Sequence, residues 1–189
     1  FELLTLREAN GEALAGWKVG LTSIAMQRQQ GVHEPCLGHL LVSGQRPAPA
    51  TFDFDTLHRP GFENELCLRV GKPLEGKDVS LADAAHAVES IAPALEIIER
   101  RSALGTDFPL AIAGNAQQHA YVTGAFTPFQ GDLDLAGVEA VVSINGIEQE
   151  HATGAEVLGT PLESIRWLAG KLAEFGRRLE AGTLVMSGS

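Results

Sequence analysis

Two glutamates in the segment "FENELCLRVG" are spaced so that they could hold a cation together. Glu63 and Glu65 are two residues apart, so on a β-strand their side chains leave the same face. Neighbouring carboxylates repel each other unless a cation lies between them. The alternative is an ordinary solvated strand face, on which both carboxylates are in water.

A third carboxylate, Glu96, lies in the apolar run "ALEIIERR", between Leu95 and Ile97. A glutamate in so apolar a run needs a partner. Three carboxylates that leave further positions open to water and substrate describe a site for a hard cation, Mg²⁺ or Mn²⁺. In the alternative interpretation, Glu96 pairs with Arg100 one helical turn further along.

A single lysine, Lys18, lies between Trp17 and Val19 in the segment "GWKVGLTS". Strand alternation would place Lys18 on one face and its two neighbours on the other. Lysine is rarely buried unless it is paired, so an inward-facing Lys18 needs an anionic partner or a chemical role. Otherwise it is an edge-strand lysine that discourages aggregation.

The elements that must position these residues are mostly strands. "FENELCLRVG" alternates apolar and polar residues and ends at a glycine, and "AGTLVMSGS" begins another strand at the end of the chain. "VEAVVSINGIEQEH" predicts a hairpin, because Asn145-Gly146 favours a type I′ turn.

Two segments predict helices. "SLADAAHAVESI" has Ser80 as its N-cap and Asp83 three residues later. In "TPLESIRWLAGKLAEFGRRL", Thr160 is the N-cap, Pro161 takes the first helical position and Glu163 completes a capping box. Apolar residues recur on one face of that helix: Leu162, Ile165, Leu168, Leu172 and Phe175. Clustered strands with few helices and no regular βαβ alternation favour an α+β fold.

Composition narrows the class of protein. The 189 residues, 44% hydrophobic and 20% charged, suit one globular domain with a sizeable core. The net charge of -10 argues against a nucleic-acid partner. No apolar run approaches the ~20 residues of a membrane helix, and two cysteines without CxxC spacing fit a reducing cytoplasm. Phosphate-binding glycine motifs, a GxSxG elbow and an HExxH zinc motif are absent from the sequence.

Four blocks of sequence carry a resemblance to a known family: "GWKVGLTSIAMQRQQGVHEPCLGHL", "ENELCLRVG", "ALEIIERR" and "GTPLESIRWLAGKLAEFGRRLEAGTLVMSGS". Together and in this order they resemble the 2-keto-4-pentenoate hydratases, a branch of the fumarylacetoacetate hydrolase superfamily that also contains 4-oxalocrotonate decarboxylases. The last block is the most specific. The resemblance implies a mixed β-roll of the fumarylacetoacetate hydrolase C-terminal-domain type with a few flanking helices.

The resemblance also implies a site. Its metal ligands would be Glu63, Glu65 and Glu96, holding Mg²⁺ or Mn²⁺ as a Lewis acid. Lys18 would be the catalytic lysine, which balances the substrate carboxylate or relays protons if burial lowers its pKa. The residues implied to bind substrate are Lys18, Leu21, Arg101, Asn115 and Gln117.

The implied reaction adds water to 2-hydroxypenta-2,4-dienoate (2-keto-4-pentenoate), or a close relative, to give a 4-hydroxy-2-oxo acid in aromatic catabolism. The implied partners are this small 2-oxo or 2-hydroxydienoic acid and further copies of the chain in a homo-oligomer. The sequence departs from the family in "AGNAQQHAYVTG", where Gly114 replaces an aspartate and Gln117 a serine. Gln117 could hydrogen-bond to substrate but cannot act as an acid or base.

Two alternatives remain open at this point. The same metal site could support decarboxylation of a 2-oxo-3-enedioate or hydrolysis of an acylpyruvate, with Arg101 or Arg59 holding a second carboxylate. The chain could also be a catalytically silent relative that still binds metal and a 2-oxo acid. Because family segments are missing at both ends, we expect residues 1–189 to be a single catalytic domain truncated at both ends.

Overall fold

The computed structural model describes residues 1–101 and 107–189. Its centre is an eight-stranded mixed sheet in the order β2-β1-β10-β4-β5-β6-β3, with β7 paired to β5, while β8 and β9 form a separate hairpin. The strands are β1 (Leu14–Gly20), β2 (Cys36–Leu41), β3 (Gln45–Pro47), β4 (Pro60–Val70), β5 (Val88–Glu99), β6 (Gln118–Thr123), β7 (Thr127–Pro128), β8 (Glu139–Ile144), β9 (Ile147–Thr153) and β10 (Leu184–Met186). The helices are α1 (Glu2–Ala9), α2 (Ile24–Gln30), α3 (Leu81–Ala87), α4 (Phe108–Ala113) and α5 (Pro161–Ala173).

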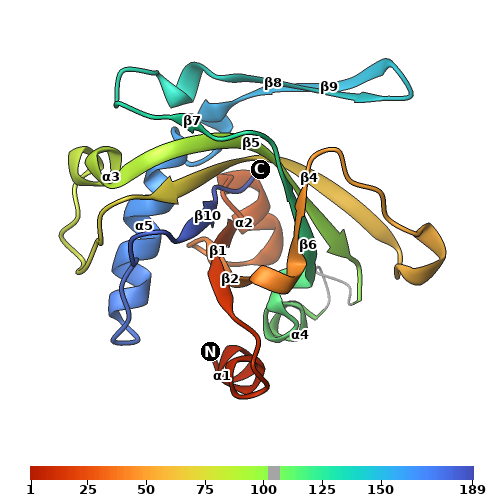
Figure 1. Ribbon diagram of the computed structural model, residues 1–189, viewed down its shortest axis with the longest axis horizontal. Helices are drawn as coiled ribbons and strands as arrows, with labels where there is room; N and C mark the ends of the chain where they lie inside the picture. The colour runs from red at the N-terminus through yellow and green to blue at the C-terminus, as the bar shows by residue number, and fades with distance from the viewer. Residues whose placement is uncertain (102–106) are drawn as a thin grey trace.

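The sheet curls into a partly closed roll, with the β8–β9 hairpin outside β5 and α5 against the other side (Figure 1). Two pairs of strands, β1–β10 and β3–β6, are parallel, and the other pairs are antiparallel. The predicted α+β class and the mixed roll are therefore confirmed. Within the described ranges, no helix is both long and apolar enough to cross a membrane.

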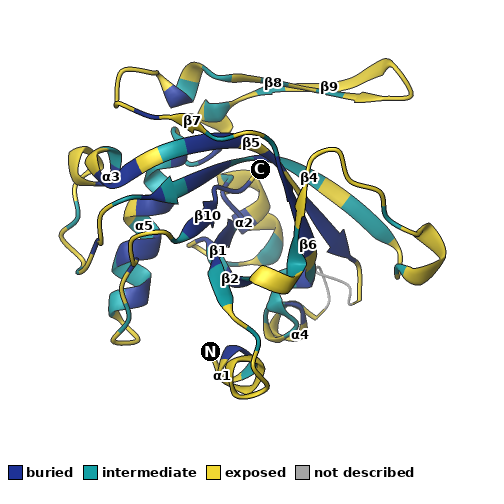
Figure 2. Cartoon of the chain, in the orientation of Figure 1, coloured by how far each residue is buried: buried dark blue, intermediate teal, exposed yellow. Residues whose placement is uncertain are grey.

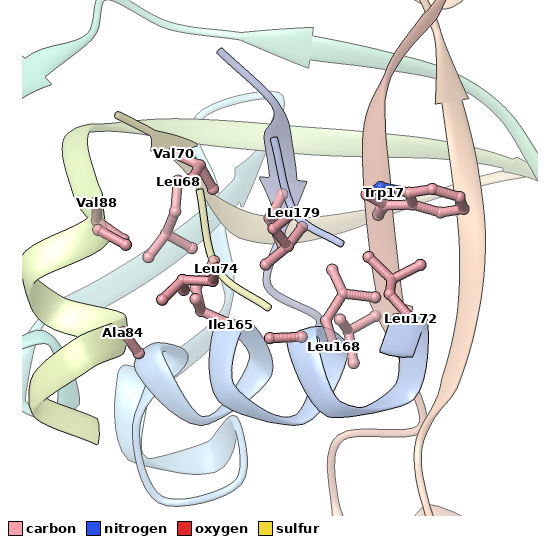
Figure 3. Close-up of a cluster of buried hydrophobic side chains, with 14 of the residues drawn as sticks. Trp17, Leu68, Val70, Leu74, Ala84, Val88, Ile165, Leu168, Leu172 and Leu179 are labelled. Atoms are coloured by element: carbon pink, nitrogen blue, oxygen red, sulfur yellow. The ribbon is translucent and has the colours of Figure 1, made fainter. Parts of the chain in front are cut away.

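The main hydrophobic core lies between α5 and one face of the central strands. Ile165, Leu168 and Leu172 of α5 pack with Trp17 of β1 and Leu68 of β4 (Figure 3). Buried residues are concentrated in the central strands and α5, whereas the β8–β9 hairpin is largely exposed (Figure 2). Packing against α5 fixes the face of β1 that carries Trp17 and Val19. The opposite face, which carries Lys18, is thereby fixed as well.

Several local expectations are confirmed. Asn145 and Gly146 have φ values of 53° and 78°, as a type I′ hairpin turn between β8 and β9 requires. Ser80 caps α3 in a reciprocal capping box with Asp83. Strands form in "GWKVG", "FENELCLRV" and "LVM", within the segments where the sequence predicts them.

Both predicted helices were too long. The segment 88–91 belongs to β5 instead of continuing α3. Helix α5 ends at Ala173, so Phe175 lies beyond it with 54% of its surface exposed, not in the core. The capping box predicted for α5 is also wrong. The Thr160 side chain makes no capping hydrogen bond. The Glu163 carboxylate accepts a hydrogen bond from the Arg166 side chain at 2.7 Å and so does not bind the backbone N–H of Thr160.

Candidate metal centre

Three carboxylates from two neighbouring strands meet inside the sheet. Glu63 and Glu65 lie on β4, and Glu96 lies on β5 directly opposite Glu63 in the ladder. One oxygen from each carboxylate lies within 4.8 Å of the others. Glu96 is completely buried, Glu65 is 8% exposed and Glu63 is half-buried. A solvated strand face is therefore the wrong interpretation of Glu63 and Glu65.

Each carboxylate has one oxygen that the protein itself holds. Glu65 Oε2 accepts a hydrogen bond from the Gly188 backbone N–H at 2.6 Å, and Glu96 Oε1 accepts one from Lys18 Nζ at 2.7 Å. Ser189 Oγ donates to Glu63 Oε2 over a longer distance of 3.5 Å. These contacts orient the carboxylates, as supporting groups commonly do around metal ligands.

The opposite oxygens of the two buried glutamates have no donor. Glu65 Oε1 and Glu96 Oε2 are inaccessible to solvent and accept no hydrogen bond from the described residues. A buried carboxylate oxygen without a partner is costly. A divalent cation among the three carboxylates would satisfy both oxygens, and an all-oxygen donor set suits a hard ion. The residues present therefore fit a divalent metal.

The electrostatics of the cluster support the same conclusion. Burial raises the pKa of Glu65 well above its ordinary value, and the charges of Glu96 and Glu63 raise it further. Burial also raises the pKa of Glu96, although the nearby Lys18 ammonium opposes that shift. Both shifts show that the carboxylates repel one another in a poorly solvated place, and a bound cation would remove that repulsion.

Lys18 is buried beside this cluster. It is 3% exposed, and its strand β1 runs between β2 and β10, so the edge-strand interpretation is wrong. Its ammonium donates to Glu96 Oε1 at 2.7 Å and makes a longer contact of 3.4 Å with the Ala116 carbonyl oxygen. The alternative partner for Glu96 is also wrong, because Arg100 donates instead to the Pro60 carbonyl oxygen at 3.2 Å.

A lysine that relays protons at neutral pH needs a lowered pKa, but the pKa of Lys18 is raised. Burial alone lowers this pKa, but attraction to Glu96, then to Glu63 and Glu65, outweighs burial and raises the pKa above its ordinary value. The side chain is therefore an ammonium ion at neutral pH.

A short turn, Asn115–Gln117, brings the Ala116 carbonyl to Lys18. Asn115, Ala116 and Gln117 have φ values of 63°, 49° and 66°. Asn115 Oδ1 accepts from the His39 backbone N–H at 2.8 Å, and Asn115 Nδ2 donates to the His39 carbonyl oxygen at 2.9 Å. Gln117 is buried, with 4% of its surface exposed.

The hydrogen bonds of the remaining implied substrate residues, Leu21 and Arg101, go to groups other than Lys18 and the three carboxylates. The buried Leu21 follows β1 with a φ of 56°, and its carbonyl oxygen accepts a hydrogen bond from Gln27 at 2.9 Å. Arg101 is 43% exposed in its side chain and donates to Glu99 Oε2 and to the Gly114 and Gln118 carbonyl oxygens at 3.0–3.1 Å. Arg59, the other arginine considered for a second carboxylate, is exposed.

Sequence reasoning missed several residues of the centre. Gly38 faces Lys18 across the β1–β2 ladder, and a Cβ there would lie 2.8 Å from Asn115 Oδ1 and 2.9 Å from Lys18 Cγ. Gly188 and Ser189 also contact the carboxylates, although the sequence predicts only a strand for their segment and assigns neither residue to the site. A glycine inside a strand often marks a close approach, which was the available signal for Gly38.

A groove of about 1150 Å³ reaches the carboxylates from outside the sheet. Its lining includes Glu63 and Glu65 together with apolar residues such as Phe62 and Leu95 and residues of the β8–β9 hairpin. Lys18 and Glu96 are not part of this lining. The groove is a mostly apolar space with acidic groups at one place.

Comparison with known proteins places the chain among related sequences. Residues 39–189 match the family model described as the fumarylacetoacetate (FAA) hydrolase C-terminal domain. The chain is 34% identical to a 2-keto-4-pentenoate hydratase of Paraburkholderia xenovorans, over 95% of this chain and 67% of that protein. It is also 34% identical to a 4-oxalocrotonate decarboxylase of Pseudomonas putida, over 100% of this chain and 72% of that protein.

A solved structure of a related protein has a very similar fold. The 4-oxalocrotonate decarboxylase from Pseudomonas putida G7, complexed with magnesium and adipate, superposes with a TM-score of 0.91 at 33% identity. The superposition covers 100% of this chain and 72% of that one.

Proposed function

The chain belongs to the fumarylacetoacetate hydrolase family, and on that premise we propose that it is a divalent-metal-dependent hydratase. It would add water to 2-hydroxypenta-2,4-dienoate, or a close relative, and release a 4-hydroxy-2-oxo acid during aromatic catabolism. The identity to a named 2-keto-4-pentenoate hydratase over 95% of the chain supports this reaction class.

The observation that carries the proposal is the set of three carboxylates with two buried, unsatisfied oxygens. Glu63, Glu65 and Glu96 would hold the metal. We propose Mg²⁺, which a relative's structure contains, and Mn²⁺ suits the same oxygen donors. When bound, the metal would supply Lewis acidity toward the 2-oxo group of the substrate.

Lys18 supplies a fixed positive charge to the same centre. Its ammonium is buried, is held by Glu96 and faces the region of the carboxylates. In the proposed reaction it would balance negative charge on the substrate, because an ammonium with a raised pKa keeps its proton. Leu21 and Gln117 are the proposed neighbours of the substrate chain.

A decarboxylase is the second candidate, because a named 4-oxalocrotonate decarboxylase is equally identical over the entire chain. Its substrate carries a second carboxylate, which would need a basic partner. Arg101 already donates three hydrogen bonds within the protein, so the exposed Arg59 is the freer of the two arginines considered for that role.

The test is to follow the ultraviolet absorbance of freshly generated 2-hydroxypenta-2,4-dienoate with Mg²⁺ or with EDTA. Metal-dependent loss with 4-hydroxy-2-oxopentanoate as product supports the hydratase. Release of CO₂ from a 2-oxo-3-enedioate without hydration would favour the decarboxylase. If neither substrate is consumed while Mg²⁺ still binds, the chain is a catalytically silent relative.

We further propose that residues 1–189 act as a single catalytic domain in the cytoplasm and assemble as a homo-oligomer. The two cysteines, Cys36 and Cys67, are not joined in a disulfide, which is typical of a reducing compartment. The family relationship supports the oligomer, and light scattering on the purified protein would measure its size.

A further inference from the structure

The turn Asn115–Gln117 has an unusual backbone. Three successive residues, none of them glycine, have left-handed φ values between 49° and 66°. Residues other than glycine visit this region as isolated residues, because the side chain crowds the backbone there. Such a run persists only where the surrounding structure holds it in place, and strain of this kind is concentrated at functional sites.

Asn115 holds the turn from one side by acting as a strand neighbour. Strand β2 is at the edge of the sheet, so the backbone groups of His39 that point away from β1 need other partners. The Asn115 amide both accepts from the His39 N–H and donates to the His39 carbonyl. This is the pattern of an antiparallel hydrogen-bonded pair. An aspartate could only accept, so the amide is specifically suited to this role.

Arg101 holds the same turn at its two ends. One guanidinium nitrogen, Nη2, donates to the carbonyl oxygens of Gly114 and Gln118, the residues that flank the left-handed run. The other, Nη1, donates to Glu99 Oε2 at 3.1 Å. Glu99 in turn accepts from the His58 backbone N–H at 2.8 Å. The turn is thus fastened to the end of β5 as well as to the edge of β2.

What the turn presents to the metal centre is the Ala116 carbonyl oxygen, 3.4 Å from Lys18 Nζ. An ammonium has three N–H groups. Glu96 and Ala116 are acceptors for two of them, so these two acceptors together set the direction of the third N–H. Asn115 and Lys18 also pack against the same position, Gly38. A movement of the turn would therefore displace the Lys18 side chain.

We propose that Asn115 and Arg101 are positioning residues: they hold the left-handed turn so that the Ala116 carbonyl fixes the direction of the Lys18 ammonium. This assignment rests on the proposed function of Lys18. It differs from direct substrate binding in that the two residues act through the backbone groups that they hold, those of His39, Gly114 and Gln118.

The experiment compares two variants that loosen the turn from different sides. Asn115→Gly removes the amide but tolerates the left-handed backbone. Arg101→Lys keeps the charge but cannot bridge two carbonyls and a carboxylate at once. Asn10→Gly is the matched control, since it makes the same exchange of asparagine for glycine at an exposed position where α1 ends. Each is assayed for kcat, KM, Mg²⁺ affinity and hydrogen exchange by mass spectrometry.

For positioning residues, we expect both loosened variants to lower kcat by about 10- to 100-fold, with KM and Mg²⁺ affinity within about twofold of the wild type. Peptides covering 36–41 should exchange faster in Asn115→Gly, and Asn10→Gly should behave as the wild type in all four measurements. A raised KM with unchanged kcat would overturn the proposal in favour of substrate binding.

The failure of the proposed function gives a different result. In that case the wild type itself consumes no substrate, and the anchoring role is decided by hydrogen exchange alone. Faster exchange at 36–41 in Asn115→Gly and at 114–118 in Arg101→Lys supports it, whereas unchanged exchange in both overturns it.

Discussion

Lys18 and Glu96 are both almost completely buried, and neither charge would be stable there without the other. Their 2.7 Å hydrogen bond joins β1 to β5. Removing one partner of such a pair leaves an uncompensated buried charge, which typically destabilises a protein by about 3–5 kcal/mol. The pair therefore has a structural consequence that can be separated from its proposed catalytic one.

Lys18→Met should show this separation. In EDTA, we expect the free energy of unfolding to fall by about 3 kcal/mol or more, because Glu96 loses its cation. Added Mg²⁺ should restore part of that loss while turnover stays at least about 100-fold below the wild type. Denaturant unfolding, calorimetric Mg²⁺ titration and the dienoate assay provide the three readouts. Full turnover in this variant would remove Lys18 from the mechanism.

His39 predicts a pH dependence of stability. Burial, followed by the charge of Arg7, lowers the pKa of its imidazole from 6.5 to about 4. As the pH falls below about 6.5, the unfolded chain takes up a proton at His39 that the folded protein refuses until about pH 4. Stability from this group is therefore present above pH 6.5 and is lost progressively between pH 6.5 and 4.

His39→Gln should flatten this part of the stability profile, which urea unfolding at a series of pH values would measure. The backbone contacts of residue 39 with Asn115 do not involve the imidazole, so turnover at neutral pH should change little. A surface histidine variant, His151→Gln, serves as the control. An unchanged slope between pH 6.5 and 4 in His39→Gln would contradict this account of the imidazole.

At the scale of elements, short-range sequence patterns predict the strands and turns that depend on neighbouring residues, but not the pairing of distant segments. Strand β4 and the β8–β9 hairpin follow from alternation and from Asn145-Gly146, which act over a few residues. The segment 88–91 was wrongly assigned to a helix. Its pairing with β4, for example Val70 with Val88, is a long-range contact that overrides local helix propensity.

Replacing a glycine by alanine should have opposite effects at Gly38 on β2 and at Gly170 in α5. Gly38→Ala on β2 would bring a Cβ within 3 Å of Lys18 Cγ and Asn115 Oδ1, so we expect kcat to fall by about tenfold or more through displacement of both groups. Gly170→Ala in α5 meets only Lys77 Cα, at 3.8 Å. It should stabilise the protein by about 0.5–1 kcal/mol with normal turnover.

Parallel kinetics and thermal melts of the two variants would check this pair. Near-normal kcat in Gly38→Ala would mean that Lys18 and Asn115 can move aside without loss, which would also weaken the case for a fixed ammonium.

At the scale of the whole molecule, the centre is assembled from segments that are far apart in the chain. The parallel pairing of β1 with β10 sets Gly16 opposite Leu184 and brings the C-terminal Gly188 and Ser189 to the carboxylates. Residue types and spacing could nominate Glu63, Glu65, Glu96 and Lys18. That these four residues come together, and that Gly188 and Ser189 join them, depends on strand order, which local patterns do not encode.

Because the three carboxylates repel one another, a divalent cation should act on the stability of the entire protein. At Mg²⁺ about 100-fold above its dissociation constant, linkage gives about 2.7 kcal/mol, or a rise in Tm of about 5–10 °C for a chain of this size. Glu65→Gln should abolish that rise and, in EDTA, should melt above the wild type, since it removes a buried like charge.

The control, Glu89→Gln, changes an exposed carboxylate and should keep the full rise in scanning fluorimetry. If Glu65→Gln kept it too, the metal would lie elsewhere than among these three glutamates.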